Sequence, residues 1–119
     1  MNPRPIAPAE ADLVRWLLAR AGQRAGADAL ATQVAGLLVA SQCDCGCPSV
    51  DFLVEGLSAT ASIVAEAEGR APDGTLVGVI LWARADRLSG LEVYALGDSV
   101  TGSLPRPEDL HPSSAIGAR

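Results

Sequence analysis

The sequence contains no lysine, and all nine of its basic residues are arginine. Asp and Glu together number 14, which gives the chain a formal net charge of -5. Binding to a nucleic-acid backbone requires clustered positive charge that displaces counterions. We therefore do not expect nucleic acid as a partner. A positively charged protein surface would instead be attracted to this acidic chain.

Long apolar runs are also missing. Runs such as Leu37-Leu38-Val39-Ala40 are far shorter than the roughly 20 apolar residues of a membrane-spanning helix. The first residues, Met1-Asn2-Pro3-Arg4-Pro5, lack the apolar core of a signal peptide. We expect a cytoplasmic protein that does not associate with membranes.

Catalytic and cofactor-binding motifs are absent as well. The sequence has no G-x-x-x-x-G-K-[ST], G-x-G-x-x-G or G-x-S-x-G string. Its single histidine, His111, falls in the predicted C-terminal tail, where it lacks an orienting partner, and this argues against a catalytic base. These absences favour a protein that is not an enzyme and that holds no organic cofactor.

The apolar spacing predicts one α+β domain over residues 1–110, followed by a disordered tail at 111–119. A helix is expected from Pro8 to the glycine at 22, and a shorter helix from Asp28 to Gly36. Alternating patterns predict five strands, at about 37–44, 50–55, 59–68, 76–83 and 91–96. Short connections, including an Asp73-Gly74 turn and a polar link over 84–90, favour an antiparallel meander with the N-terminal helix on one face. Residues 76–83 are apolar on both faces, so this strand is expected to be the central and most buried one.

A cluster of three thiols, Cys43, Cys45 and Cys47, is the most unusual local feature. An odd number of cysteines within five residues does not suit a secreted disulfide framework. Thiolates bind zinc or copper(I), but alternate residues of a strand lie about 6.6 Å apart, which is too wide for one tetrahedral site without a bend at Gly46. A reversible disulfide is another possibility, and a purely structural hairpin is the simplest.

Two further sets of residues have a functional and a structural interpretation. Glu66 and Glu68 share one strand face and would form an acid/base site if Glu55 or Asp51 lay beside them, but a solvated sheet face explains them equally well. Trp82 and Tyr94 lie on the last two predicted strands and are neighbours if those strands pair. They either pack within the domain, with Trp16 as a contact, or form an aromatic anchor for a partner.

The order of these motifs resembles a group of small uncharacterised bacterial proteins. The resemblance rests on Cys-x-Cys-Gly-Cys-Pro-Ser-Val-Asp at 43–51, the later Leu-Glu-Val-Tyr at 91–94 and Leu-Pro-x-Pro-x-x-Leu at 104–110. It implies a shared fold and a bacterial cytosolic location, and it transfers no catalytic residue. The Leu-Glu-Val-Tyr segment with its following acidic glycine turn also resembles small immunity-type proteins that neutralise toxins.

The sequence therefore favours a small, non-enzymatic interaction protein, a monomer or a homodimer, whose partner is another protein and whose contact residues include Trp82 and Tyr94. The alternative is a metal-binding or redox protein that works through Cys43, Cys45 and Cys47 with zinc or copper. A small hydrolase or isomerase that uses sheet-face carboxylates is the third hypothesis.

Overall fold

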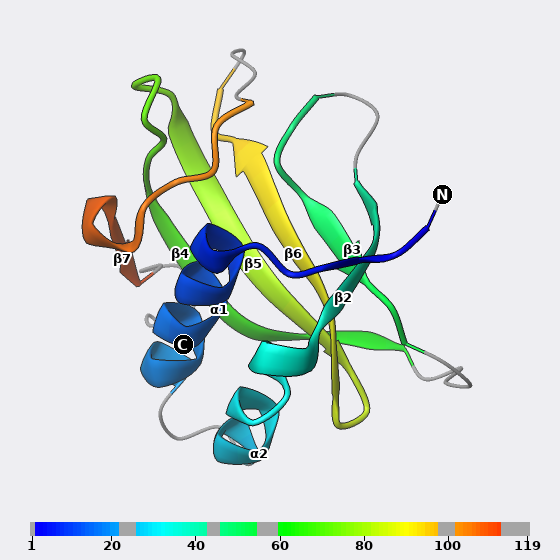
Figure 1. The fold of residues 1–119 in the computed structure, drawn as a ribbon. Coiled ribbons are helices and arrows are strands. Elements are labelled where there is room, and N and C mark those ends of the chain that lie inside the picture. The colour runs from blue at the N-terminus through cyan, green and yellow to red at the C-terminus, as the bar shows by residue number, and fades with distance from the viewer. Residues whose placement is uncertain (1, 22–25, 43–45, 55–59, 98–101, 113–119) are drawn as a thin grey trace.

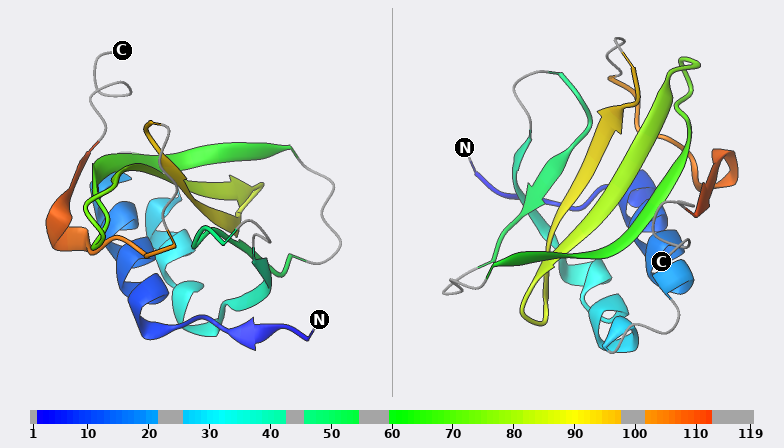
Figure 2. Two further views of the ribbon diagram at one scale, coloured as in Figure 1. Left: turned by 90° about the horizontal axis from the view of Figure 1, so that it is seen from above. Right: turned by 180° about the vertical axis from the view of Figure 1, so that it is seen from behind.

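The computed structural model of the chain describes residues 2–21, 26–42, 46–54, 60–97 and 102–112. These residues form an α+β fold in which two helices lie on one face of a seven-stranded antiparallel sheet (Figures 1 and 2). The helices are α1 (Pro8–Ala21) and α2 (Ala27–Ala31), and two short 3-10 turns are η1 (Val34–Gly36) and η2 (Pro107–Asp109). The strands are β1 (Arg4–Pro5), β2 (Leu38–Gln42), β3 (Val50–Phe52), β4 (Ala61–Arg70), β5 (Leu76–Arg84), β6 (Arg87–Ala95) and β7 (Leu110–Pro112). The predicted fold class is confirmed, but the number of strands is seven and not five.

The strands follow the order β1-β2-β3-β6-β5-β4-β7. The predicted meander is present only in β4, β5 and β6, which pair along nearly their whole lengths (Figure 1). The predicted β2–β3 hairpin forms, yet β3 adds to the far edge of β6 through Val50 opposite Leu91 and Asp51 opposite Gly90. Pairing between consecutive strands is only a tendency. Because two short hairpins tie β4, β5 and β6 together, β3 takes the edge of β6 that they leave.

The two strands missed by the sequence pattern are the shortest ones at the sheet edges. Both contain proline, Pro5 in β1 and Pro112 in β7. Proline removes a backbone donor and is tolerated in a sheet mainly at such edges. Because proline argues against a strand in a sequence pattern, these two strands were not predicted. The predicted tail at 111–119 is wrong at its start, since His111 and Pro112 belong to β7, and residues 113–119 lie outside the described part of the chain.

Residues 84–90 were predicted to be a polar connection, but almost all of them belong to strands. Arg84 ends β5 and pairs with Arg87, so only Ala85 and Asp86 separate β5 from β6. Ala85 adopts a φ of 52°, in the left-handed region that tight turns require. The segment is polar because it forms the exposed end of the β5–β6 hairpin, and it is not a long connecting loop.

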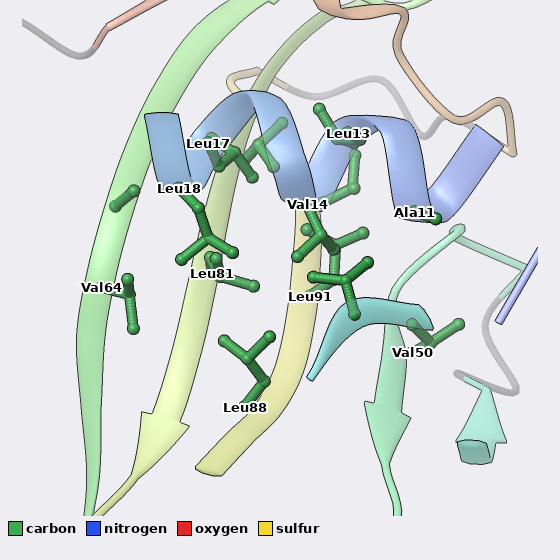
Figure 3. Close-up of a cluster of buried hydrophobic side chains, with 14 of the residues drawn as sticks. Ala11, Leu13, Val14, Leu17, Leu18, Val50, Val64, Leu81, Leu88 and Leu91 are labelled. Carbon is green, nitrogen blue, oxygen red and sulfur yellow. The ribbon is translucent and has the colours of Figure 1, made fainter. Parts of the chain in front are cut away.

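The core lies between α1 and the sheet. Leu13, Val14, Leu17 and Leu18 lie at helical spacing and are buried, and Figure 3 shows their side chains close to Leu81 and other buried residues of the sheet. Burial of each such side chain contributes roughly 1.5–3 kcal/mol. The C-terminal segment adds Leu104, Pro105 and Leu110 to this core.

The start of α1 is fixed by a buried carboxylate. Glu10 accepts a hydrogen bond from the backbone N–H of Ala7 at 2.9 Å, the geometry of a capping box, and Pro8 occupies the first turn. Both terminal nitrogens of the Arg4 guanidinium donate to the same carboxylate at 3.0 and 2.9 Å. Burial raises the pKa of Glu10, but these hydrogen bonds outweigh it and leave the pKa below its ordinary value. One side chain thus links β1 to α1.

The predicted centre of the sheet, β5, is buried on one face only. Its inner residues Val77, Val79, Leu81 and Ala83 are fully buried in the core. On the opposite face Leu76 is 49% exposed, while Ile80 and Trp82 are half-buried. The expectation that β5 is covered on both faces is therefore wrong for the described residues, because both helices pack on the same side of the sheet (Figure 2). No described helix is both long and apolar enough to cross a membrane.

Candidate interaction surface

The side of β4, β5 and β6 that points away from the helices is called the outer face here. The strand register aligns the residues of this face in rows across the three strands. Six large apolar or aromatic side chains on this face are at least partly exposed: Ile63, Leu76, Ile80, Trp82, Tyr94 and Leu96. Isolated exposed apolar residues are ordinary on a protein surface, whereas a continuous apolar strip typically marks an interaction site.

Carboxylates flank the apolar strip on both sides at its centre. Glu66 lies opposite Ile80 on one side, and Glu92 lies opposite Ile80 on the other. Glu68 lies opposite Gly78, with Tyr94 on the far side of that glycine. The outer face is therefore an aromatic and aliphatic surface with an acidic centre.

Trp82 is held in place by a hydrogen bond across the strands. Its indole N–H donates to Oε1 of Glu92 at 3.0 Å, along the diagonal between β5 and β6. An indole N–H without an acceptor would lose its hydrogen bonds to water on binding and would pay a desolvation cost. The contact fixes the ring while leaving it half-buried, which suits a preorganised anchor.

The position of the Tyr94 ring depends on the absence of a side chain at Gly78. A Cβ at Gly78, directly opposite Tyr94, would overlap the end of the tyrosine ring. The ring therefore occupies the space above the backbone of β5, and Tyr94 remains 37% exposed. Desolvation raises the pKa of Tyr94, and the negative charges of Glu66, Glu68 and Glu92 raise it further. The pKa of the Tyr94 phenol therefore depends in part on the carboxylates at the centre of the outer face.

The strands of Trp82 and Tyr94 pair and both residues lie on this face, but the prediction that they are neighbours is wrong. Trp82 pairs with Gly90, four residues before Tyr94 on β6, which corresponds to about 13 Å along the strand. The proposed contact with Trp16 is wrong. Trp16 lies on α1, where the guanidinium of Arg20 sits 4.4 Å from its ring centroid.

A shallow groove of about 310 Å³ lies beside Trp82. Gly90 and Leu91 of β6 lie along it, and its polar wall includes Glu92 and Asp51. Asp51 belongs to β3, and its Oδ2 accepts a hydrogen bond from the Ser41 hydroxyl at 3.1 Å. Its Oδ1 would lie 3.5 Å from a Cβ placed on Gly90, so this carboxylate oxygen overlies the glycine. An indole and two carboxylates thus surround a position without a side chain.

The carboxylate site predicted for catalysis does not assemble from the described residues. Glu66 and Glu68 lie on β4, and β5 and β6 separate them from Asp51 on β3, a distance of about 14 Å at the usual strand spacing. Glu55 lies outside the described residues. His111 on β7 is opposite Glu68 and exposed, rather than part of a mobile tail.

Only one of the three predicted thiol ligands can be placed. Cys43 and Cys45 lie outside the described residues, whereas Cys47 is half-buried and its Sγ lies 3.5 Å from the Ser49 hydroxyl. That hydroxyl accepts from the Val93 N–H at 2.8 Å and donates to the Val93 carbonyl at 3.1 Å. Within the described part of the chain, no group of three or more metal-ligating side chains occurs. The visible surroundings of Cys47 belong to the junction between the β2–β3 hairpin and β6.

A second groove, of about 560 Å³, lies where β3 and β6 diverge. Leu38 and Leu53 border it and are 38% and 39% exposed. Gln33 on its floor donates to the Asp86 carbonyl and accepts from the Leu88 N–H at 3.0 Å. Gln33 therefore replaces the strand pairing that β6 lacks at this end, which is a structural role.

Sequence reasoning singled out Trp82 and Tyr94 but missed Asp51 and Gly90 as neighbours of Trp82. Gly90 fell in the segment predicted as a connection, and Asp51 was assigned to a strand remote from β6. The only available signal was that a glycine within a β-strand often marks a close approach by another group.

Comparison with known proteins adds no relative. The chain matches no family model, and searches of curated proteins and of solved structures gave no significant match. The resemblance to a small bacterial family therefore stays a prediction, and the site must be interpreted from its own geometry.

Proposed function

We propose that this protein is a non-enzymatic binding protein and that the outer face of β4, β5 and β6 is its contact surface for another protein. The observation that carries this proposal is the preorganised Trp82–Glu92 pair within a strip of exposed aromatic and aliphatic side chains. Tryptophan and tyrosine are favoured at the energetic centres of interfaces. The mixture of apolar and polar side chains over the whole face is also compatible with a non-obligate interface, which is about as apolar as the rest of a protein surface.

Charge favours a partner with a basic surface. The centre of the outer face carries Glu66, Glu68 and Glu92, and the chain as a whole has a formal charge of -5. A second copy of the chain would place these carboxylates against each other if it docked through the same face. Like charges opposed in this way are destabilising, so we assign the surface to a partner of opposite charge.

Arginines mark the two ends of the outer face. Arg70 lies opposite Leu76, and its guanidinium donates to the Gly74 carbonyl at 3.0 Å. Arg84 lies at the other end of β5, opposite Ala61. The positive charges therefore flank the acidic centre, and they give a partner a charge pattern that fixes its orientation on the strip.

Site-specific photo-crosslinking in cells tests the proposal. A photoreactive residue is introduced singly at Leu76 or Ile63 on the outer face and, as matched controls, at the exposed positions Asp12 and Arg15 on α1. We expect a discrete heterologous adduct from the outer-face positions that is lost when Trp82→Ala is added. Adducts from the α1 positions only, adducts that persist with Trp82→Ala, or no adduct at all would contradict the proposed surface.

A further inference from the structure

We infer that the groove over Gly90 receives a positively charged side chain, arginine or lysine, from the partner. This inference rests on the proposed function, because it names the chemistry that the outer face recognises. It concerns the groove bordered by Trp82, Glu92 and Asp51 and not the apolar strip as a whole.

The groove offers a cation one aromatic surface and two carboxylates. Tryptophan attracts cations more strongly than the other aromatic residue types, and the attraction extends to about 6 Å from the ring centroid. Trp82 supplies this aromatic surface. Glu92 receives the indole N–H at Oε1, so its carboxylate is fixed beside the ring. A guanidinium or ammonium group placed here would meet both attractive groups at once.

Asp51 completes the site from the other side. Its Oδ2 is engaged by the Ser41 hydroxyl, and its Oδ1 overlies Gly90. The two carboxylates come from β3 and β6, which pair at this point through Asp51 opposite Gly90. A planar guanidinium matches a carboxylate through two parallel hydrogen bonds, so arginine would fit best.

The absence of a side chain at Gly90 keeps the groove accessible. A Cβ at this position would make only ordinary contacts, 3.5 Å from Asp51 Oδ1 and from the Val50 carbonyl oxygen. Alanine is therefore compatible with the fold, whereas it narrows the space that a cation would occupy. A loss of binding in a Gly90→Ala variant would therefore report exclusion of the ligand from the groove and not misfolding of the protein.

The chain's own Arg84 lies beside the neighbouring part of this surface. It borders an adjacent groove of about 230 Å³ together with Asp51, Trp82 and Gly90. Its charge makes that side less favourable for a second cation. The incoming side chain is therefore placed on the Glu92 side of the Trp82 ring.

Selection of a random 12-residue peptide library on the immobilised full chain tests the inference. We expect the enriched peptides to share one arginine or lysine, and replacement of that arginine by citrulline to weaken binding about tenfold. Asp51→Asn, Glu92→Gln and Gly90→Ala should each weaken binding severalfold, while Asp12→Asn on α1 should leave it unchanged. The citrulline peptide tests the charge even if a protein variant is unstable.

The outcomes separate this inference from the proposed function. Peptides that lose binding with Trp82→Ala but share no cationic residue would overturn the cation site and leave the outer face as the contact surface. Cationic peptides that tolerate Asp51→Asn, Glu92→Gln and Gly90→Ala would also overturn the site. Failure to enrich any peptide sensitive to Trp82→Ala would overturn both proposals.

Discussion

The indole N–H of Trp82 and the carboxylate of Glu92 form a 3.0 Å hydrogen bond across β5 and β6 on the face opposite the helices. This bond orients a large aromatic side chain without burying it. It also fixes one carboxylate beside the groove over Gly90. The aromatic and the acidic character of the surface therefore depend on the same pair.

Replacing Glu92 by glutamine should keep the fold and alter the environment of Trp82. The pair is exposed, so we expect a loss of less than about 1 kcal/mol in the free energy of unfolding. The glutamine amide oxygen can still accept the indole hydrogen, whereas Glu92→Ala removes the acceptor. Tryptophan fluorescence in a Trp16→Phe background, which leaves Trp82 as the single tryptophan, should shift with Glu92→Ala more than with Glu92→Gln. Equal spectra for all three proteins would show that the bond does not hold the ring.

The ionisation of Tyr94 reports the acidic centre of the outer face. Burial raises the pKa of its phenol, and the charges of Glu66, Glu68 and Glu92 add to that effect. The double substitution Glu66→Gln and Glu68→Gln should therefore lower the pKa. Because Tyr94 is the only tyrosine in the chain, the ultraviolet absorbance of phenolate follows it alone during an alkaline titration.

The matched control for this titration is Glu108→Gln, which removes an exposed carboxylate from η2. It should leave the phenol titration where it is in the unsubstituted protein. A double variant with the same titration as the control would mean that Glu66 and Glu68 do not act on Tyr94.

Two strand glycines should respond differently to alanine. At Gly78 the added Cβ would meet the end of the Tyr94 side chain, which can change its rotamer. We therefore expect the free energy of unfolding to change by less than about 1 kcal/mol. At Gly69 it would meet the Asp109 carbonyl oxygen and the Cα of Leu110, both backbone atoms of the docked C-terminal segment. Gly69→Ala should therefore cost about 1–3 kcal/mol and weaken β7 pairing.

Urea denaturation of both glycine variants measures this difference, and amide hydrogen exchange at Leu110 follows the docking of β7. Equal losses of stability at the two positions would contradict the packing described for Gly69. A displaced Tyr94 ring in Gly78→Ala should nevertheless weaken peptide binding to the outer face.

The Arg4–Glu10 pair should make stability depend on pH. The folded-state pKa of Glu10 lies below its ordinary value of 4.5, so its contribution is fully present above about pH 5. It is lost as the pH falls through the folded-state pKa, because protonation removes the charge that Arg4 and the Ala7 N–H stabilise. Glu10→Gln should cost about 1–2 kcal/mol at pH 7 and should reduce the acid dependence of unfolding.

Urea denaturation at several pH values between about 7 and 3 checks this account. Asp12→Asn, an exposed position on the same helix, is the control and should retain the acid dependence. A Glu10→Gln protein whose stability falls with pH as steeply as the control would contradict the assignment.

The sequence was sufficient to predict the helices and most strands where local patterns decide the structure. Pro8 and the leucines of α1 placed the first helix, and Asp73-Gly74 placed the turn between β4 and β5, where Gly74 has a φ of 89°. The pairing of β3 with β6 could not be predicted because it depends on which sheet edge remains after the long strands have paired. The site shows the same division. Trp82 and Tyr94 were visible as residue types, whereas the approach of Asp51 to Gly90 follows from that long-range pairing.

The central claim is that the outer face, and not the helical side, binds a positively charged partner. The most direct test is an NMR titration of the isotopically labelled full chain with an acetylated hexa-arginine peptide. The account predicts that chemical shifts change first at the Trp82 indole N–H and at the amides of Gly90, Glu92 and Asp51, and that high salt weakens these changes. Shift changes centred on Asp12 and Asp28 of the helices, or spread evenly over all acidic residues, would contradict it.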